Sequence, residues 1–140
     1  AFNGSSMADT LARAEEATTL LKQNYTTWAR EDIEKGQRCL DDATGDPAKA
    51  RIHLDGLFAI MHNVKGQGAS FGYPLVTRLA QSLCKLVGAK HDAGEPMLRI
   101  AQAHLDALKL VLDQRIEGPG GETGEKLVGK LETLAQQLVG

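Results

Sequence analysis

His62 and the residues that follow it carry the clearest chemical signal in this sequence. Lys65 comes three residues after His62, and Gly66 comes four residues after it. A neutral imidazole is a nitrogen nucleophile near pH 7, because the unperturbed pKa of histidine is about 6.5. In a helix Lys65 lies one turn away, where its charge can neutralise a phosphoryl group on the ring. This spacing predicts phosphoryl chemistry at His62.

Helical periodicity places His62 on a side that faces water. At about 100° per residue, the large apolar side chains of the segment fall between roughly 100° and 180° from His62. These side chains are Leu57, Met61, Val64 and Phe71. The side chains within roughly 60° of His62 are mostly polar or small: Arg51, Asp55, Phe58, Ala59, Lys65, Gly66 and Ala69. We therefore expect His62 to be exposed.

Gly66 is unusual, because a glycine inside a helix costs about 0.5 to 1 kcal/mol relative to alanine. Its bare backbone, together with the small side chains of Ala59 and Ala69, leaves space beside His62 for a reactive group of another protein. We expect a docking surface on this side of the helix, formed by Arg51, Asp55, Phe58, Ala59 and Ala69. Gly68 repeats the cost, and we expect it to loosen the end of the helix.

The other histidines and the cysteines do not have the spacing of a metal site. No two histidines lie four residues apart and no H-E-x-x-H motif occurs, so we expect no bound metal. His104 belongs to an apolar stripe and is expected to be a core or boundary histidine. The two cysteines, Cys39 and Cys84, are too few and too far apart for a disulfide framework. This favours a reducing compartment, the cytoplasm.

The composition is that of one soluble domain. The chain has 140 residues, of which 42% are hydrophobic, enough for a single core. No run approaches the roughly 18 to 20 apolar residues of a membrane span, and no secretory signal is recognisable. The net charge of -2 is spread along the chain, without the basic stripe that nucleic-acid binding requires. We expect neither a membrane nor a nucleic acid as partner.

Residues that form helices well dominate the chain, and aromatic residues make up only 4% of it, which favours an all-α fold. Glycine and proline mark three breaks: Gly45-Asp46-Pro47, Gly72-Tyr73-Pro74 and Gly118-Pro119-Gly120-Gly121. At the first break we expect Asp46 to cap the helix that follows. Helical spacing then predicts helices over about 25–43, 47–71, 74–88, 95–117 and 122–139.

The segment before these helices is also helical in pattern. We expect a bend or break between Asn24 and Thr27, where residues of weak helix propensity meet. Short connections make neighbouring helices antiparallel, so the sequence predicts an antiparallel up-down four-helix bundle with an additional N-terminal helix. Residues 1–6 look like the remnant of an expression tag, which makes Met7 the natural start and 7–140 the domain.

The residues that follow His62 resemble the phosphorylation motif of histidine-containing phosphotransfer domains in two-component phosphorelays: His62-Asn63-Val64-Lys65-Gly66-Gln67-Gly68-Ala69-Ser70-Phe71-Gly72. That motif pairs H-x-x-K-G with an apolar residue and a glycine five and six positions later. The expected helices from about Tyr25 to Val139 agree with the family's architecture. The resemblance implies that His62 accepts phosphate, that Lys65 assists, and that Gly66 permits a response-regulator receiver domain to dock near Phe58.

The same resemblance implies a monomeric phosphocarrier rather than an enzyme. Its partners would be a histidine kinase and receiver domains, with Mg on the receiver and no cofactor in this chain. Gln67 and Gly68 depart from the family, which usually has small Ser or Ala residues there. In chemotaxis-kinase phosphotransfer domains a glutamate of the third helix orients the imidazole, whereas an ungapped alignment puts Cys84 there. Gln81, one turn earlier, could hydrogen-bond to the ring instead.

The missing glutamate favours a free-standing relay protein over a phosphoacceptor domain excised from a chemotaxis-type or hybrid histidine kinase. The histidine-bearing dimerisation region of a sensor kinase is a poorer match, because it has an acidic residue and a nearby proline after its histidine. Here Asn63 follows His62, and the next proline is Pro74. A helical module that binds response regulators without being phosphorylated stays open as an alternative.

Overall fold

The computed structural model describes residues 6–88 and 93–139, and these residues form helices and the turns between them. The α-helices are α1 (Met7–Gly45), α2 (Ala50–Gly68), α3 (Pro74–Gly88), α4 (Glu95–Asp113) and α5 (Gly121–Val139). Short 3-10 helices flank α2 at Pro47–Lys49 and Ala69–Phe71. No strand occurs within the described ranges. The predicted all-α fold is confirmed.

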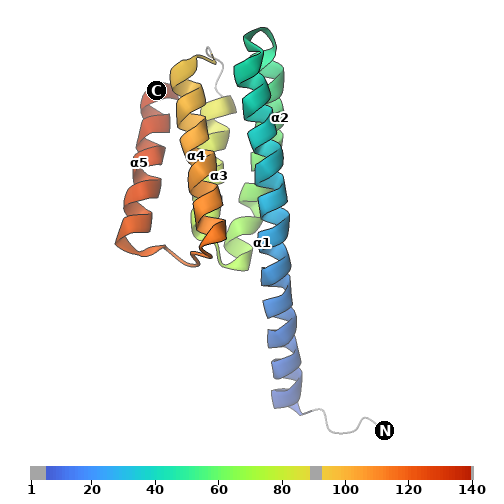
Figure 1. Ribbon diagram of the computed structural model, residues 1–140. Helices are drawn as coiled ribbons and strands as arrows, with labels where there is room; N and C mark the ends of the chain where they lie inside the picture. The colour runs from blue at the N-terminus through green and yellow to red at the C-terminus, as the bar shows by residue number, and fades with distance from the viewer. Residues whose placement is uncertain (1–5, 89–92, 140) are drawn as a thin grey trace.

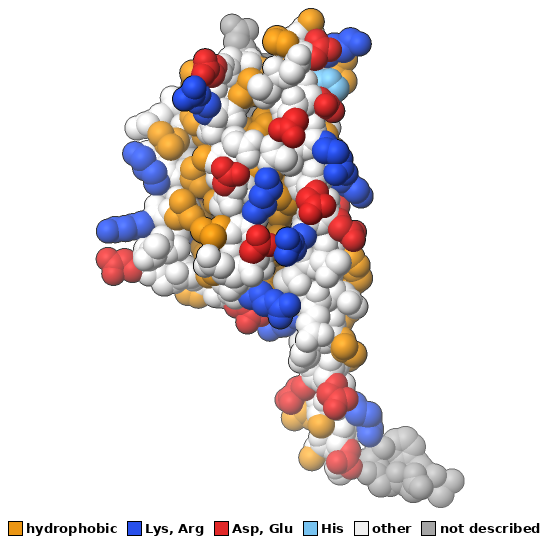
Figure 2. Space-filling view, in the orientation of Figure 1, with side chains coloured by type: hydrophobic (Ala, Val, Ile, Leu, Met, Phe, Trp, Pro, Cys, Tyr) orange, Lys and Arg blue, Asp and Glu red, His pale blue; other side chains and the backbone are white. Residues whose placement is uncertain are grey.

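Packing contacts give the arrangement of the helices. Helix α1 packs against α2 and α4, and α3 also packs against α2 and α4, so these four helices form a closed ring of contacts. Helix α5 packs on the outside of the ring, against α3 and α4 (Figure 1). The first half of α1 extends well beyond the other helices (Figure 1). Figure 2 shows acidic and basic side chains interspersed over the visible face of the molecule.

Helix α1 is continuous, so the expected break between Asn24 and Thr27 is wrong. Thr26 fits inside the helix because its hydroxyl donates a hydrogen bond to the carbonyl oxygen of Gln23, at 2.8 Å. Tyr25 is buried, and its ring stacks on that of Phe71 with the ring centroids 4.9 Å apart. Packing therefore outweighs weak helix propensity here. The additional N-terminal helix is the exposed first half of α1 rather than a separate element.

The start of α1 is fixed by a capping box. The backbone N–H of Asp9 donates to the hydroxyl of Ser6 at 3.0 Å, and the backbone N–H of Ser6 donates to the Asp9 carboxylate. Of the predicted tag remnant at 1–6, residues 1–5 lie outside the described residues, whereas Ser6 is part of the fold.

The ends of two other helices differ from expectation. Asp46 makes no capping hydrogen bond with its side chain, although Pro47 does begin the turn that follows it. Helix α4 stops at Asp113 rather than near 117, because Arg115 adopts the left-handed conformation with φ of 51°. That turn lets the backbone N–H of Gly118 donate to the carbonyl oxygen of Gly72, at 3.0 Å, which ties the loop before α5 to the loop before α3.

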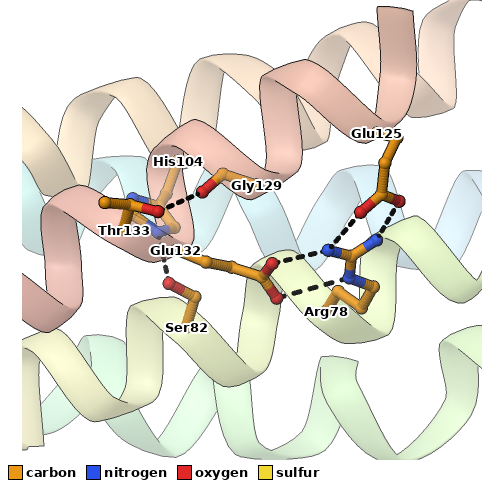
Figure 3. Close-up of polar contacts among 7 residues, drawn as sticks. All are labelled: Arg78, Ser82, His104, Glu125, Gly129, Glu132 and Thr133. Carbon is orange, nitrogen blue, oxygen red and sulfur yellow. Dashed lines mark hydrogen bonds and ion pairs between the residues drawn. The ribbon is translucent and has the colours of Figure 1, made fainter. Parts of the chain in front are cut away.

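His104 lies in the core, as predicted, and has no solvent exposure (0%). Its Nδ1 donates to the carbonyl oxygen of Ile100 at 2.7 Å, so Nε2 must accept the hydrogen bond from the Ser82 hydroxyl at 2.8 Å (Figure 3). Burial lowers the pKa of His104 below its usual value. The imidazole is therefore neutral near pH 7, with both nitrogens engaged.

An ion-pair cluster beside His104 holds α5 against α3. The Arg78 guanidinium contacts Glu125 at 2.6 Å and Glu132 at 2.5 Å (Figure 3). The hydrogen bonds that Arg78 donates to Glu132 and Glu125 raise the pKa of Arg78, and the one to Glu125 lowers the pKa of the Glu125 carboxyl.

No helix within the described ranges has the length and apolar character needed to cross a membrane.

Candidate functional site

His62 lies near the middle of α2, and its side chain is exposed. The opposite side of α2 is buried, with Leu57 and Met61 fully enclosed and Val64 nearly so. This division follows from helical geometry, because those three side chains point away from His62 around the helix. Helix α2 thus presents the imidazole to solvent while its other side packs on α1 and α3.

Phe58, one turn before His62, is the aromatic neighbour of the imidazole. The two rings are stacked, with centroids 6.3 Å apart and planes 14° from parallel. Phe58 is 39% exposed, and the rest of its ring lies against the end of α3. A Cβ added at Gly88 would stand 2.9 Å from Cε2 of Phe58. The Cys84 thiol of α3 donates a weak hydrogen bond to the backbone carbonyl oxygen of Phe58 at 3.7 Å.

Gly66 and Gly68 differ sharply in their surroundings. A Cβ added at Gly66 would meet nothing within 4 Å, so packing inside the chain does not require a glycine there. A Cβ added at Gly68 would stand 2.5 Å from the Thr77 hydroxyl oxygen and 3.0 Å from the Tyr73 carbonyl oxygen. Gly68 does not loosen the helix end as expected. It permits close packing of α2 on the start of α3, where the Tyr73 N–H donates to the Gly68 carbonyl oxygen at 2.8 Å.

The residues of the predicted docking surface fall into two groups. Phe58 and Ala59 are exposed on the side of α2 that carries His62, and Ala69 is exposed at the start of the 3-10 helix that follows α2. Arg51 and Asp55 are also exposed, but they pair with each other at 3.0 Å. The Arg51 guanidinium also donates to the carbonyl oxygen of Val87, which fastens the N-terminal part of α2 to the end of α3. Arg51 therefore has a structural contact within the chain.

Lys65, in the last turn of α2, is half-buried, and its carbonyl oxygen accepts a hydrogen bond from the Thr77 hydroxyl of α3 at 3.2 Å. Because Thr77 faces Lys65 and Cys84 faces Phe58, Gln81 lies level with the turn of α2 that carries His62. Gln81 is exposed, and in the described residues no hydrogen bond joins it to His62. Its hydrogen bond to the imidazole stays a prediction.

Two further observations describe the chemistry around α3. Gln81 lines a cleft between α3 and α5 together with Arg78, Lys85 and Glu132. Burial raises the pKa of the Cys84 thiol, with a smaller opposing effect of the charge on Lys65. Within the ranges that the structure describes, no group of three or more His, Cys, Asp or Glu side chains could hold a metal ion.

The sequence did not predict two contacts between α2 and α3. One is the packing of the Phe58 ring against Gly88, and the other is the set of hydrogen bonds that Thr77 makes with Lys65 and Ala69. Both depend on how closely α3 approaches α2, which no local spacing encodes. Gly88 carried only the signal of a helix end, which it also is.

Comparison with known families decides what this helical protein is. The family model of the Hpt domain matches residues 5–118. The chain belongs to the Hpt domain family. The match covers α1 to α4 and ends before α5, so α5 lies outside the matched part of this Hpt domain. No curated protein and no solved structure shows significant similarity to the chain.

Hpt domains act in histidine phosphotransfer in two-component signalling. They are phosphocarriers rather than catalysts, and they interact with receiver domains and kinases. The matched region includes His62 and all of α2.

Proposed function

We propose that this Hpt domain carries a phosphoryl group on His62 and exchanges it with aspartates of response-regulator receiver domains. The observation that carries the proposal is the exposed imidazole on α2, followed by Lys65 and by the open space over Gly66. A Cβ at Gly66 would meet nothing within 4 Å, so the described residues leave open space one turn after His62 for a partner's reactive group.

The main contribution of this chain to the transfer is an exposed nucleophile, a ring nitrogen of His62. The lone pair of a neutral ring nitrogen attacks the phosphorus of the partner's aspartyl phosphate, forming a nitrogen–phosphorus bond. The phosphorus–oxygen bond to aspartate breaks, and the aspartate leaves as a carboxylate. The reverse reaction passes the group to another receiver. Lys65 supplies positive charge near the phosphoryl oxygens, and Mg on the partner's receiver supplies the remainder, so the proposal needs no cofactor in this chain.

The proposal also concerns architecture and setting. We take the ring of α1 to α4 as an antiparallel up-down four-helix bundle, with 7–140 as the domain. We propose a monomeric, free-standing relay protein of the cytoplasm that receives phosphate from a histidine kinase or a receiver. The absence of glutamate at Cys84 supports this over a domain excised from a kinase.

The docking surface is proposed to be the exposed side of α2 around His62. Phe58 supplies its largest apolar side chain, while Ala59 and Ala69 keep the surface low enough for a partner to reach the imidazole. Arg51 and Asp55 form a charged rim whose pairing fixes its geometry.

The test mixes the protein with a radiolabelled, phosphorylated receiver domain and follows label that is acid-labile but stable to alkali. Label is expected on the parent and on His53→Gln, the matched control, because His53 is on the same helix but half-buried. No label is expected on His62→Gln. If His62→Gln accepts as much label as the parent, the assignment is wrong. A parent that binds the receiver without accepting label would identify a module that is not phosphorylated.

A further inference from the structure

We propose that Phe58 is a positioning residue for the His62 imidazole, and that Gly88 at the end of α3 is the seat that fixes Phe58. The inference rests on the proposed function of His62 and deepens it. It assigns Phe58 a role in the transfer step that is separate from any role in docking.

The imidazole is held by one contact. No hydrogen bond or ion pair to the His62 side chain occurs in the described part of the chain, and the Phe58 ring is stacked on it. An exposed side chain on a helix otherwise exchanges among rotamers. The two rings are nearly parallel with their centroids 6.3 Å apart, so they are offset: the Phe58 ring borders the imidazole on one side and leaves its other side open. The ring therefore keeps a preferred orientation while its nitrogens stay accessible.

Phe58 is itself fixed by α3. Two carbons of its ring, Cε2 and Cδ2, lie 2.9 Å and 3.1 Å from the position that a Cβ at Gly88 would occupy, so only a glycine leaves the ring in this place. The backbone of Gly88 does not need glycine for conformational reasons, because its φ lies outside the left-handed region. Among the described residues, only the Phe58 ring lies within 4 Å of the position that a Cβ at Gly88 would occupy.

A second contact holds this end of α3 in register with α2. The Arg51 guanidinium bonds both the Asp55 carboxylate and the carbonyl oxygen of Val87, the residue next to Gly88. The seat and the stacked rings thus form one connected unit, which runs from Arg51 through the end of α3 to Phe58 and His62.

Orientation matters because phosphoryl transfer requires the attacking nitrogen and the leaving oxygen to be roughly in line. A ring that spends more of its time in the productive orientation reacts faster at the same affinity for the partner. A positioning role therefore changes the maximal rate of transfer, whereas a docking role changes the receiver concentration needed for half-maximal rate.

The first experiment uses Gly88→Ala, which adds one methyl group under the Phe58 ring. Its matched control is Gly129→Ala on α5, where a Cβ would meet nothing within 4 Å. We expect Gly88→Ala to lower the maximal rate of transfer from a phosphorylated receiver by about fivefold or more. The half-saturating receiver concentration should stay within about twofold of the parent. Gly129→Ala should match the parent in both quantities.

The second experiment reads the stack directly by NMR. In the parent, the His62 ring protons should show cross-relaxation with the Phe58 ring protons and a ring-current shift. Both signals should weaken in Gly88→Ala and disappear in Phe58→Leu, whereas Phe58→Tyr should retain them together with the parent's maximal rate. Phe58→Leu also keeps the test valid if Gly88→Ala folds poorly, which circular dichroism detects.

The outcomes separate this inference from the function on which it rests. A parent that accepts no phosphate would refute the proposed function, and an absent cross-relaxation signal would refute the stack. If the parent accepts phosphate and both variants transfer at the parent's maximal rate, Phe58 does not position the ring. A change confined to the half-saturating concentration would assign Phe58 to docking alone.

Discussion

Two histidines of this protein have opposite surroundings. His62 is exposed on α2 with an aromatic ring on one face, and His104 is enclosed in the core with both ring nitrogens hydrogen-bonded. A nucleophile needs an available lone pair, and the lone pair of His104 is already engaged by the Ser82 hydroxyl. The difference teaches that hydrogen bonding, as much as burial, decides whether the lone pair of an imidazole is available for reaction.

Replacing His62 with glutamine is expected to have the largest effect. Glutamine suits a helix but has no nucleophilic ring nitrogen, so phosphoacceptance should fall to background. Because the side chain is exposed, the free energy of unfolding should stay within about 0.5 kcal/mol of the parent, as measured by urea denaturation. A large loss of stability would put His62 in the same class as His104.

Closing the space beside His62 should make it as unreactive as His104 without burying it. Gly66→Gln is expected to slow transfer from a phosphorylated receiver by about a hundredfold, because the new side chain stands where the partner must approach. Helix content by circular dichroism should be unchanged or slightly higher. Gly129→Gln, at another open position, is the control. Normal transfer by Gly66→Gln would show that access does not distinguish the two histidines.

Removing His104 should affect stability and leave the chemistry intact. His104→Ala opens a cavity and leaves the Ser82 hydroxyl without its partner, so we expect the free energy of unfolding to fall by about 2 to 4 kcal/mol. The folded fraction should still accept phosphate at the parent's rate. An unchanged free energy of unfolding, or loss of transfer in a variant that remains folded, would contradict the purely structural role of His104.

The smallest effect is the pH dependence that His104 adds to stability. Its pKa is lowered in the folded protein, chiefly by burial, whereas the unfolded chain titrates near about 6.5. As the pH falls below about 6.5, the unfolded state binds the proton first, so stability decreases, by at most about 1.4 kcal/mol per pH unit. The decrease ends once the folded imidazole is protonated too. Denaturation of the parent and of His104→Ala between about pH 7.5 and 5 measures this contribution, and parallel curves would contradict it.

The sequence predicted the parts of the fold that depend on local chemistry. Glycine and proline stop helices by backbone geometry alone, so the turns at Gly45-Asp46-Pro47 and Gly72-Tyr73-Pro74 could be located. The continuity of α1 could not, because it depends on Tyr25 packing against Phe71, far away in sequence. The early end of α4 likewise depends on the loop bonding to Gly72.

In the candidate site, too, some features follow from the local sequence and others depend on packing between helices. The exposure of His62 follows from angles around one helix, and the open space at Gly66 from the absence of a side chain. The tight packing at Gly68 and the seat at Gly88 depend on the approach of α3 to α2, which only the folded chain reveals.

The length of α1 has a consequence for local opening of the protein. Residues 7–21 are exposed on all sides, so their amides should exchange with solvent hydrogen by fraying, at little cost in free energy. The amides from Ile33 to Leu40 should exchange only when the whole bundle opens. Trp28, the single tryptophan, stands 48% exposed near the boundary between these regimes. Its fluorescence should therefore report the loss of the bundle while remaining insensitive to fraying of the outer turns.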